Sequence, residues 1–143
     1  MTSPRALLKS TVLVVEDDEV LRMCAAEVVT DAGFLPVEAA NADEAVAILK
    51  SRSDIALVFT DIQMPGSMDG LGLARTVHDR WPTIKIILVS GRLAVSERER
   101  PVDSLFFQKP FAMKQMIEGL QDMIRPGELR PVLNVARGIR ASR

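Results

Sequence analysis

The chain has 143 residues and a net charge of −1, with 48% hydrophobic and 26% charged residues. This length suffices for one domain with a single core, and the composition excludes a mostly disordered chain. No apolar stretch approaches the roughly 20 residues that span a bilayer, the N-terminus lacks the apolar run of a signal peptide, and a single cysteine excludes a disulfide framework. We therefore expect one domain and a cytoplasmic protein.

Strand and helix patterns alternate along the chain. Each predicted strand is a short apolar run, rich in β-branched residues and bounded by polar or turn residues. In chain order the predicted strands are Thr11–Val15, Phe34–Ala39, Ile55–Thr60, Ile84–Val89 and Ser104–Gln108. The predicted helices are Glu19–Asp31, Ala42–Lys50, Leu71–Arg80 and Ala112–Ile124, with a short or irregular helix over Val95–Arg100.

Single residues refine the boundaries and the placement of these elements. Pro36 cannot donate a ladder hydrogen bond, which places the second strand at a sheet edge. Asn41, with Glu44 three residues later, forms a capping box that opens the second helix, and Pro82 stops the third. Alternating strands and helices predict a doubly wound α/β fold with a parallel sheet, in which ligands bind beyond the carboxyl ends of the strands.

Polar side chains follow four of the predicted strands at those ends. Glu16 and Asp17 follow the first strand, and the third, fourth and fifth are followed by Asp61, Ser90 and Lys109. Three gathered carboxylates would repel one another without a cation between them, and Mg²⁺ prefers carboxylate, water and phosphate oxygens. Lysine and serine suit phosphate oxygens. The set therefore indicates a site for Mg²⁺ and a phosphoryl group.

Simpler interpretations apply to some of these residues. Acidic residues are favoured at a helix N-terminus, so the acidic run after the first strand, taken alone, indicates helix capping. We assign Asp18 to that helix start and Asp69 to turn or cap chemistry. Ser90 alone could cap the segment after it. His78, late in a helix, is expected to be a surface or half-buried residue.

The order and spacing of five motifs resemble the receiver domain of two-component response regulators, a fold shared with the chemotaxis protein CheY. The motifs are Val14-Val15-Glu16-Asp17, Thr60-Asp61-Ile62-Gln63-Met64-Pro65, Met68-Asp69-Gly70, Val89-Ser90-Gly91 and Lys109-Pro110-Phe111. The resemblance implies a five-stranded parallel sheet of order 2-1-3-4-5. It also implies a single-domain receiver over residues 10–125, with an N-terminal tail over 1–9 and a basic extension over 126–143.

The resemblance also implies a role for each site residue. Asp61 would accept a phosphoryl group from a histidine kinase or phosphotransfer protein. The implied Mg²⁺ ligands are Glu16 through water, Asp17, Asp61 and the backbone carbonyl of Gln63. Lys109 and Ser90 would hold the phosphoryl oxygens, Ser90 and Phe106 would act as the switch, and the Lys109–Pro110 peptide bond would be cis.

Partners follow from the same resemblance and from charge. A downstream protein of unknown identity would read the phosphorylated state, and phosphorylation could be linked to homodimer formation. From Arg125 onward five arginines and one glutamate give a charge of +4, which leaves −5 for the rest of the chain. This segment has no aromatic residue for base stacking, so we do not expect nucleic-acid binding.

Two departures from the family pattern affect the expected output. Gly66-Ser67 stand where the commonest pattern has one residue, so the loop beside Asp61 is longer by one. The segment over Val95–Arg100 is short and offers little apolar face. It belongs to the surface that usually carries the signal, and Phe106 lacks the hydroxyl of a tyrosine there.

Two other functions compete with a phosphorylated switch. One is a receiver-like adaptor that acts without phosphate, although every key residue is present. The other is a phosphohydrolase with an aspartyl nucleophile, but such enzymes carry a second aspartate two residues later, where this chain has Gln63. We expect a signalling switch that catalyses only its own phosphorylation and dephosphorylation, and not an enzyme for external substrates.

Overall fold

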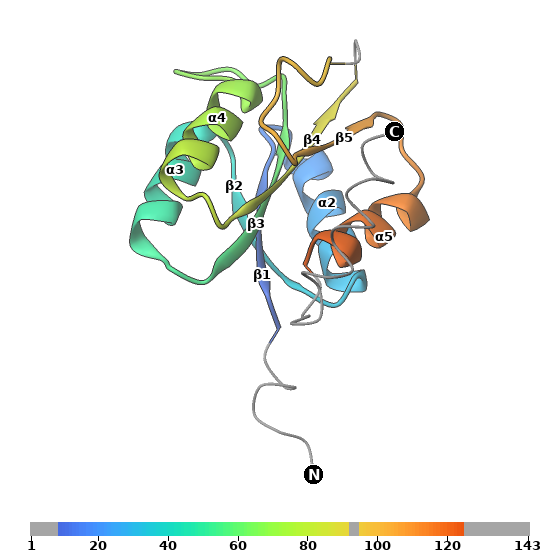
Figure 1. Ribbon diagram of the computed structural model, residues 1–143. Coiled ribbons are helices and arrows are strands. Elements are labelled where there is room, and N and C mark those ends of the chain that lie inside the picture. Colours follow the sequence, from blue (N-terminus) through green and yellow to red (C-terminus); the bar gives the residue numbers. More distant parts are fainter. Residues whose placement is uncertain (1–8, 92–94, 125–143) are drawn as a thin grey trace, which may run out of the picture.

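The computed structural model describes residues 9–91 and 95–124 (Figure 1). Within these residues five strands form one parallel sheet of order β2-β1-β3-β4-β5, as predicted. The strands are β1 (Thr11–Val15), β2 (Leu35–Ala39), β3 (Ile55–Asp61), β4 (Lys85–Ser90) and β5 (Leu105–Gln108). The helices are α2 (Glu19–Asp31), α3 (Ala42–Ser51), α4 (Gly70–Arg80) and α5 (Met113–Met123).

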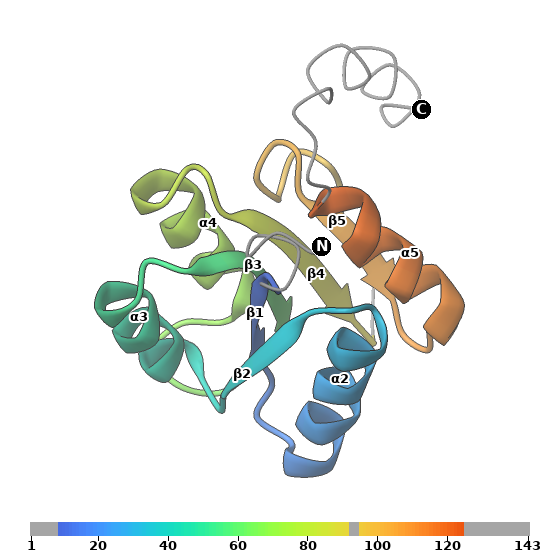
Figure 2. The ribbon, with the colours of Figure 1, turned by 90° about the horizontal axis from the view of Figure 1, so that it is seen from below.

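Helices cover both faces of the sheet. Helices α3 and α4 lie on one face and α2 and α5 on the other (Figures 1 and 2). Alternate residues of β1 enter the two cores: Leu13 and Val15 join the cluster beneath α3 and α4, whereas Val12 and Val14 join the cluster beneath α2 and α5. Successive strand side chains point to opposite faces, so a strand covered on both faces is apolar throughout.

The second strand lies at the sheet edge, as its proline predicts. Pro36 in β2 pairs in register with Val12 of β1, and among the described residues β2 has no other neighbour in the sheet. The missing N–H of Pro36 therefore interrupts no ladder on the outer side.

Short polar side chains cap three of the helices. The carboxylate of Asp18 accepts a hydrogen bond from Leu21 N at 2.9 Å at the start of α2, and Asp69 plays the same part at α4. At α3, Asn41 Oδ1 accepts from Glu44 N at 2.8 Å, and the Glu44 carboxylate accepts from the backbone N–H of Ala40. The cap assignments of Asp18, Asp69 and Asn41 are thus confirmed.

The helix expected over Val95–Arg100 is not formed, and that prediction is wrong. Residues 95–104 run as turns between β4 and β5. The Ser96 amide donates to the Glu99 carboxylate at 3.1 Å, and Pro101 disfavours helical geometry at the residue before it. Asp103 has a φ of 71°, in the left-handed region. Over Val95–Arg100, local turns therefore stand in place of the expected helix.

The ends of the chain are described only in part. The predicted basic extension over 126–143 and all but the last residue of the predicted tail over 1–9 lie outside the described residues. Among the residues that are described, no helix combines the length and the apolar character needed to cross a membrane.

Candidate functional site

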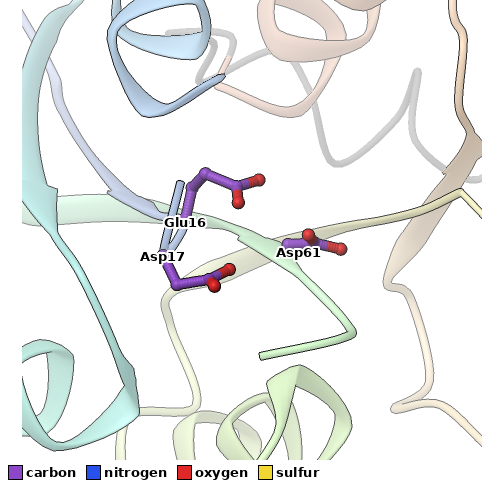
Figure 3. A group of neighbouring side chains, drawn as sticks. All are labelled: Glu16, Asp17 and Asp61. Atoms are coloured by element: carbon purple, nitrogen blue, oxygen red, sulfur yellow. The ribbon is translucent and has the colours of Figure 1, made fainter. Parts of the chain in front are cut away.

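Three carboxylates meet at the carboxyl ends of β1 and β3. Glu16 and Asp17 follow β1, Asp61 is the last residue of β3, and each offers an oxygen within 4.8 Å of the others (Figure 3). Glu16 and Asp61 are buried, at 6% and 7% exposure, whereas Asp17 is exposed. β1 and β3 are adjacent parallel strands, so their ends bring these side chains together.

Lys109 supplies a positive charge between two of the carboxylates. It follows β5, and its Nζ lies 3.2 Å from Asp61 Oδ2 and 3.3 Å from Glu16 Oε1. Burial lowers the pKa of Lys109, but the charges of Asp61 and Glu16 and the hydrogen bonds to them outweigh burial, so the pKa lies above its ordinary value. The ammonium therefore remains charged at this site.

The pKa of Glu16 also lies above its ordinary value, but for a carboxyl group this rise favours the uncharged form. Burial raises the pKa of the Glu16 carboxyl, and the nearby Asp61 charge raises it further. The backbone N–H of Asp18, which donates to Glu16 Oε2 at 3.1 Å, and the ammonium of Lys109 oppose this rise without cancelling it. The folded state therefore favours the protonated form of this carboxyl more than an exposed position would.

Ser90 and Gln63 complete the rim around Asp61. Ser90 is the last residue of β4, is 1% exposed, and its Oγ donates to Gln63 Oε1 at 3.5 Å. The backbone N–H of Gln63 donates to Asp61 Oδ1 at 3.3 Å. The Lys109 amide donates to the Ser90 carbonyl at 2.8 Å, and the Lys109–Pro110 peptide bond is cis, as expected.

Phe106 lies near Ser90 on the same face of the sheet. Leu88 of β4 pairs with Phe106 of β5, and Leu88 and Ser90, two positions apart, share a face. Phe106 is partly buried against the core cluster beneath α3 and α4. Its place is compatible with a response to movement of Ser90, and the switch role stays a prediction.

Two residues support the site although the sequence predicted no such role for them. Arg22 on α2 donates to the backbone carbonyl of Glu16 at 3.0 Å and pairs with Glu38 of β2 at 3.1 Å, so it fixes the loop that carries the acidic pair. Gly70 lies so close to Asp61 that a Cβ there would be 2.0 Å from the Asp61 carbonyl oxygen. Asp69 and Gly70 together indicate a turn, but no sequence pattern predicted the contacts of Arg22 or the close approach of Gly70 to Asp61.

The longer loop after β3 is attached to a neighbouring helix. Gly66 has a φ of +115°, and Ser67 Oγ donates to Asp43 Oδ1 of α3 at 2.7 Å. The extra residue is thus accommodated by a left-handed glycine and a side-chain contact on the exposed side of the loop.

The donor set fits a small hard cation. Carboxylate and backbone carbonyl oxygens are the ligands that Mg²⁺ accepts, and it commonly retains several waters. The three carboxylates each offer an oxygen within 4.8 Å of the others. Oxygens bound to one Mg²⁺ lie about 3–4 Å apart, so a single ion could be held by these carboxylates directly or through water.

Comparisons with known proteins agree on one family. A family model described as the response regulator receiver domain matches residues 12–121. The sensor kinase CckA of Brucella abortus (strain 2308) is 34% identical over 119 residues, which cover 80% of this chain but 12% of CckA. The response regulator receiver protein CpdR of the same organism is 29% identical over 116 residues, or 79% of this chain and 95% of CpdR.

Solved structures support the same assignment. A response regulator receiver protein from Sinorhizobium medicae WSM419 superposes with a TM-score of 0.76 at 30% identity, covering 82% of this chain and 95% of that one. The response regulator TrrA of Thermotoga maritima, in complex with Mg(2+)-BeF, gives 0.70 at 25% identity, covering 80% and 99%. With its doubly wound sheet, its acidic cluster and the match over residues 12–121, this chain belongs to the response regulator receiver domain family of two-component systems.

Proposed function

We propose that this chain is a phosphorylation-dependent signalling switch whose phosphoryl group is carried by Asp61. A histidine kinase or a phosphotransfer protein would supply that group. One observation carries the proposal: the Asp61 carboxylate lies 3.2 Å from the Lys109 ammonium and within 4.8 Å of two further carboxylates. This is the arrangement of charges that a phosphoryl group and its cation would need.

Transfer would be a direct displacement at phosphorus. An Asp61 oxygen attacks the phosphorus of a phosphohistidine in line, the new P–O bond forms as the P–N bond breaks, and the imidazole leaves with the electron pair. A carboxylate nucleophile needs no general base. Lys109 moves from the carboxylate to a phosphoryl oxygen, and the Ser90 hydroxyl donates to another.

Mg²⁺ is the cation that we propose for the acidic cluster. Asp17, Asp61 and the backbone carbonyl of Gln63 would hold it directly, and Glu16 would hold it through water. When bound, Mg²⁺ supplies positive charge beside the phosphoryl oxygens. Arg22 fixes the backbone that carries Glu16 and Asp17, so it orients these ligands.

The chain would catalyse only changes in its own phosphorylation. Water attacks the phosphorus of the aspartyl phosphate, the bond to the Asp61 oxygen breaks, and inorganic phosphate and a proton are released. While the phosphoryl group is present, its added charge draws the Ser90 hydroxyl inward, and Phe106 follows. We propose that a downstream protein or a second copy of the chain reads this change.

The relatives support the kind of partner. CckA is described as a sensor kinase, and the chain covers 12% of its length and 23% of a putative NtrX-like response regulator from Rickettsia bellii. CpdR, by contrast, is matched over 95% of its length. We therefore propose a receiver that acts through protein contacts with a histidine kinase. We also propose a cytoplasmic location, because phosphorylation by such a kinase would take place there.

The proposal is tested with radiolabelled acetyl phosphate as the phosphodonor and Mg²⁺. We expect labelling of the wild-type chain, loss of labelling in Asp61→Asn, and normal labelling in Asp79→Asn, which alters an exposed aspartate on α4. Absence of label in the wild type would favour the phosphate-independent adaptor. Sustained turnover of an external phosphoester would favour the phosphohydrolase instead.

A further inference from the structure

The side chain of Gln63 contacts the hydroxyl group that the phosphorylated state would need. Ser90 Oγ donates to Gln63 Oε1 at 3.5 Å. Ser90 is 1% exposed at the end of β4, whereas Gln63 is exposed in the loop after β3. The same glutamine is anchored at its backbone, where its N–H donates to Asp61 Oδ1 at 3.3 Å. One residue thus links the acceptor carboxylate to the serine.

A serine hydroxyl has a single donor hydrogen. Its contact with Gln63 and a contact with a phosphoryl oxygen on Asp61 are therefore alternatives. Stabilising the contact with Gln63 lowers the fraction of molecules in which Ser90 can donate to a phosphoryl oxygen. A ligand shifts such an equilibrium only to the extent that it binds one arrangement more tightly than the other.

We propose that the Gln63 side chain is a positioning residue that holds Ser90 in its unphosphorylated arrangement and so weakens binding of a phosphoryl group at Asp61. This inference rests on the proposed function of Asp61. The amide is suited to the task because it offers an acceptor oxygen without adding a fourth negative charge to the cluster of Glu16, Asp17 and Asp61.

The hydrogen bond from Ser90 to Gln63 is long, and its length limits how much it can weaken binding of a phosphoryl group. A hydrogen bond of ordinary length changes an equilibrium by roughly two- to tenfold. A separation of 3.5 Å lies at the outer limit for such a bond. Loss of the Gln63 acceptor should therefore tighten binding of a phosphoryl mimic by about two- to fourfold. A weak restraint of this size can be released by phosphorylation.

The experiment is a double-mutant cycle with beryllofluoride as the phosphoryl mimic, titrated calorimetrically at saturating Mg²⁺. Gln63→Met removes the acceptor oxygen and keeps the length of the side chain, and Ser90→Ala removes the donor. Gln115→Ala is the matched control, because Gln115 is exposed on α5. Expected are tighter binding in Gln63→Met, weaker binding in Ser90→Ala, and no further effect of Gln63→Met when Ser90 is already alanine.

The outcomes separate this inference from the function on which it rests. Unchanged or weaker binding in Gln63→Met, with normal binding by the wild type, would overturn the inference alone. The inference would also be overturned if Gln63→Met tightened beryllofluoride binding by the same factor in the Ser90→Ala background as in the wild type. Failure of the wild-type chain to bind beryllofluoride would overturn the proposed function and this inference together.

Discussion

The Lys109 ammonium lies 3.2 Å from the Asp61 carboxylate, although the two residues are 48 positions apart in the chain. The contact joins the loop after β5 to the end of β3, across the intervening strand β4. The same ammonium lies 3.3 Å from Glu16 at the end of β1. One side chain thus balances charge from two other strand ends, and its removal would leave two buried carboxylates facing each other.

Lys109→Met is expected to lower the free energy of unfolding in metal-free buffer. Removal of one partner from a fully buried ion pair costs about 3–5 kcal/mol, and partial exposure of Lys109 reduces this to about 1–2 kcal/mol. Urea unfolding at neutral pH in the presence of a chelator measures this loss in the free energy of unfolding. Lys114→Met, an exposed lysine on α5, is the control and should change stability by less than about 0.5 kcal/mol. Equal stability of Lys109→Met and the wild type would contradict the assigned role.

Mg²⁺ is expected to stabilise the folded chain through the acidic cluster. A ligand that binds only the folded state adds about 1.4 kcal/mol for each tenfold rise in its concentration above the Kd. The unfolding midpoint should therefore rise with the logarithm of Mg²⁺ concentration, measured by thermal melts. Asp17→Asn should lose most of this dependence, whereas Asp31→Asn, which alters an exposed aspartate at the end of α2, should retain it. A dependence that survives in Asp17→Asn would place the cation elsewhere.

Glu16 should make stability depend on pH in a defined direction. The pKa of Glu16 is raised above its ordinary value of 4.5, chiefly by burial, so folding favours the protonated form. Its contribution to stability is fully present below pH 4.5 and is lost as the pH rises through the raised pKa. In metal-free buffer the stability of Glu16→Gln relative to the wild type should therefore increase as the pH rises through this range. Denaturant unfolding at a series of pH values measures the difference.

Bound Mg²⁺ should change the pH dependence expected for Glu16→Gln. Saturating Mg²⁺ favours the ionised carboxylate, so it should reduce or reverse the pH-dependent advantage of Glu16→Gln. A relative stability that falls as the pH rises in metal-free buffer would show that the pKa of Glu16 is lowered.

Much of the fold and the grouping of the site could be predicted because both follow from simple periodic rules. Alternating strands and helices place the ends of parallel strands at one rim, so Glu16, Asp61 and Lys109 were expected at the same edge of the sheet. Pro36 indicated the edge position of β2 because it lacks a donor. The strand order 2-1-3-4-5 needed more than periodicity, and it came from the resemblance to a family.

The remaining features depend on side-chain direction and on local competition. Arg22 reaches the Glu16 carbonyl and Glu38 from a helix, and no spacing rule specifies where a long side chain ends. The contact between Ser90 and Gln63 depends on the path of a loop. A short or irregular helix was expected over Val95–Arg100, but the following proline and the serine–glutamate turn prevailed.

The close approach of α4 to the acceptor residue gives the last prediction. A Cβ on Gly70 would lie 2.0 Å from the Asp61 carbonyl oxygen and 2.7 Å from the Ile62 Cα, and these are backbone atoms that cannot rotate away. Gly70→Ala should therefore lower the free energy of unfolding by about 2–4 kcal/mol, since it overpacks a rigid site. Any folded fraction should label more slowly with acetyl phosphate, because the start of α4 and the Asp61 backbone must separate.

Gly72→Ala is the matched control, two residues further along the same helix. There a Cβ would lie 3.3 Å from the Met68 Cβ, so the neighbouring loop needs to shift by only a few tenths of an ångström. The gain in helix propensity of up to about 1 kcal/mol offsets this contact, so stability should change little. Urea unfolding of both variants decides the matter: equal losses would mean that the contact with the Asp61 backbone does not distinguish Gly70 from Gly72. A loss confined to Gly70→Ala would show that the absence of a side chain at Gly70 is what allows α4 to begin against the acceptor residue.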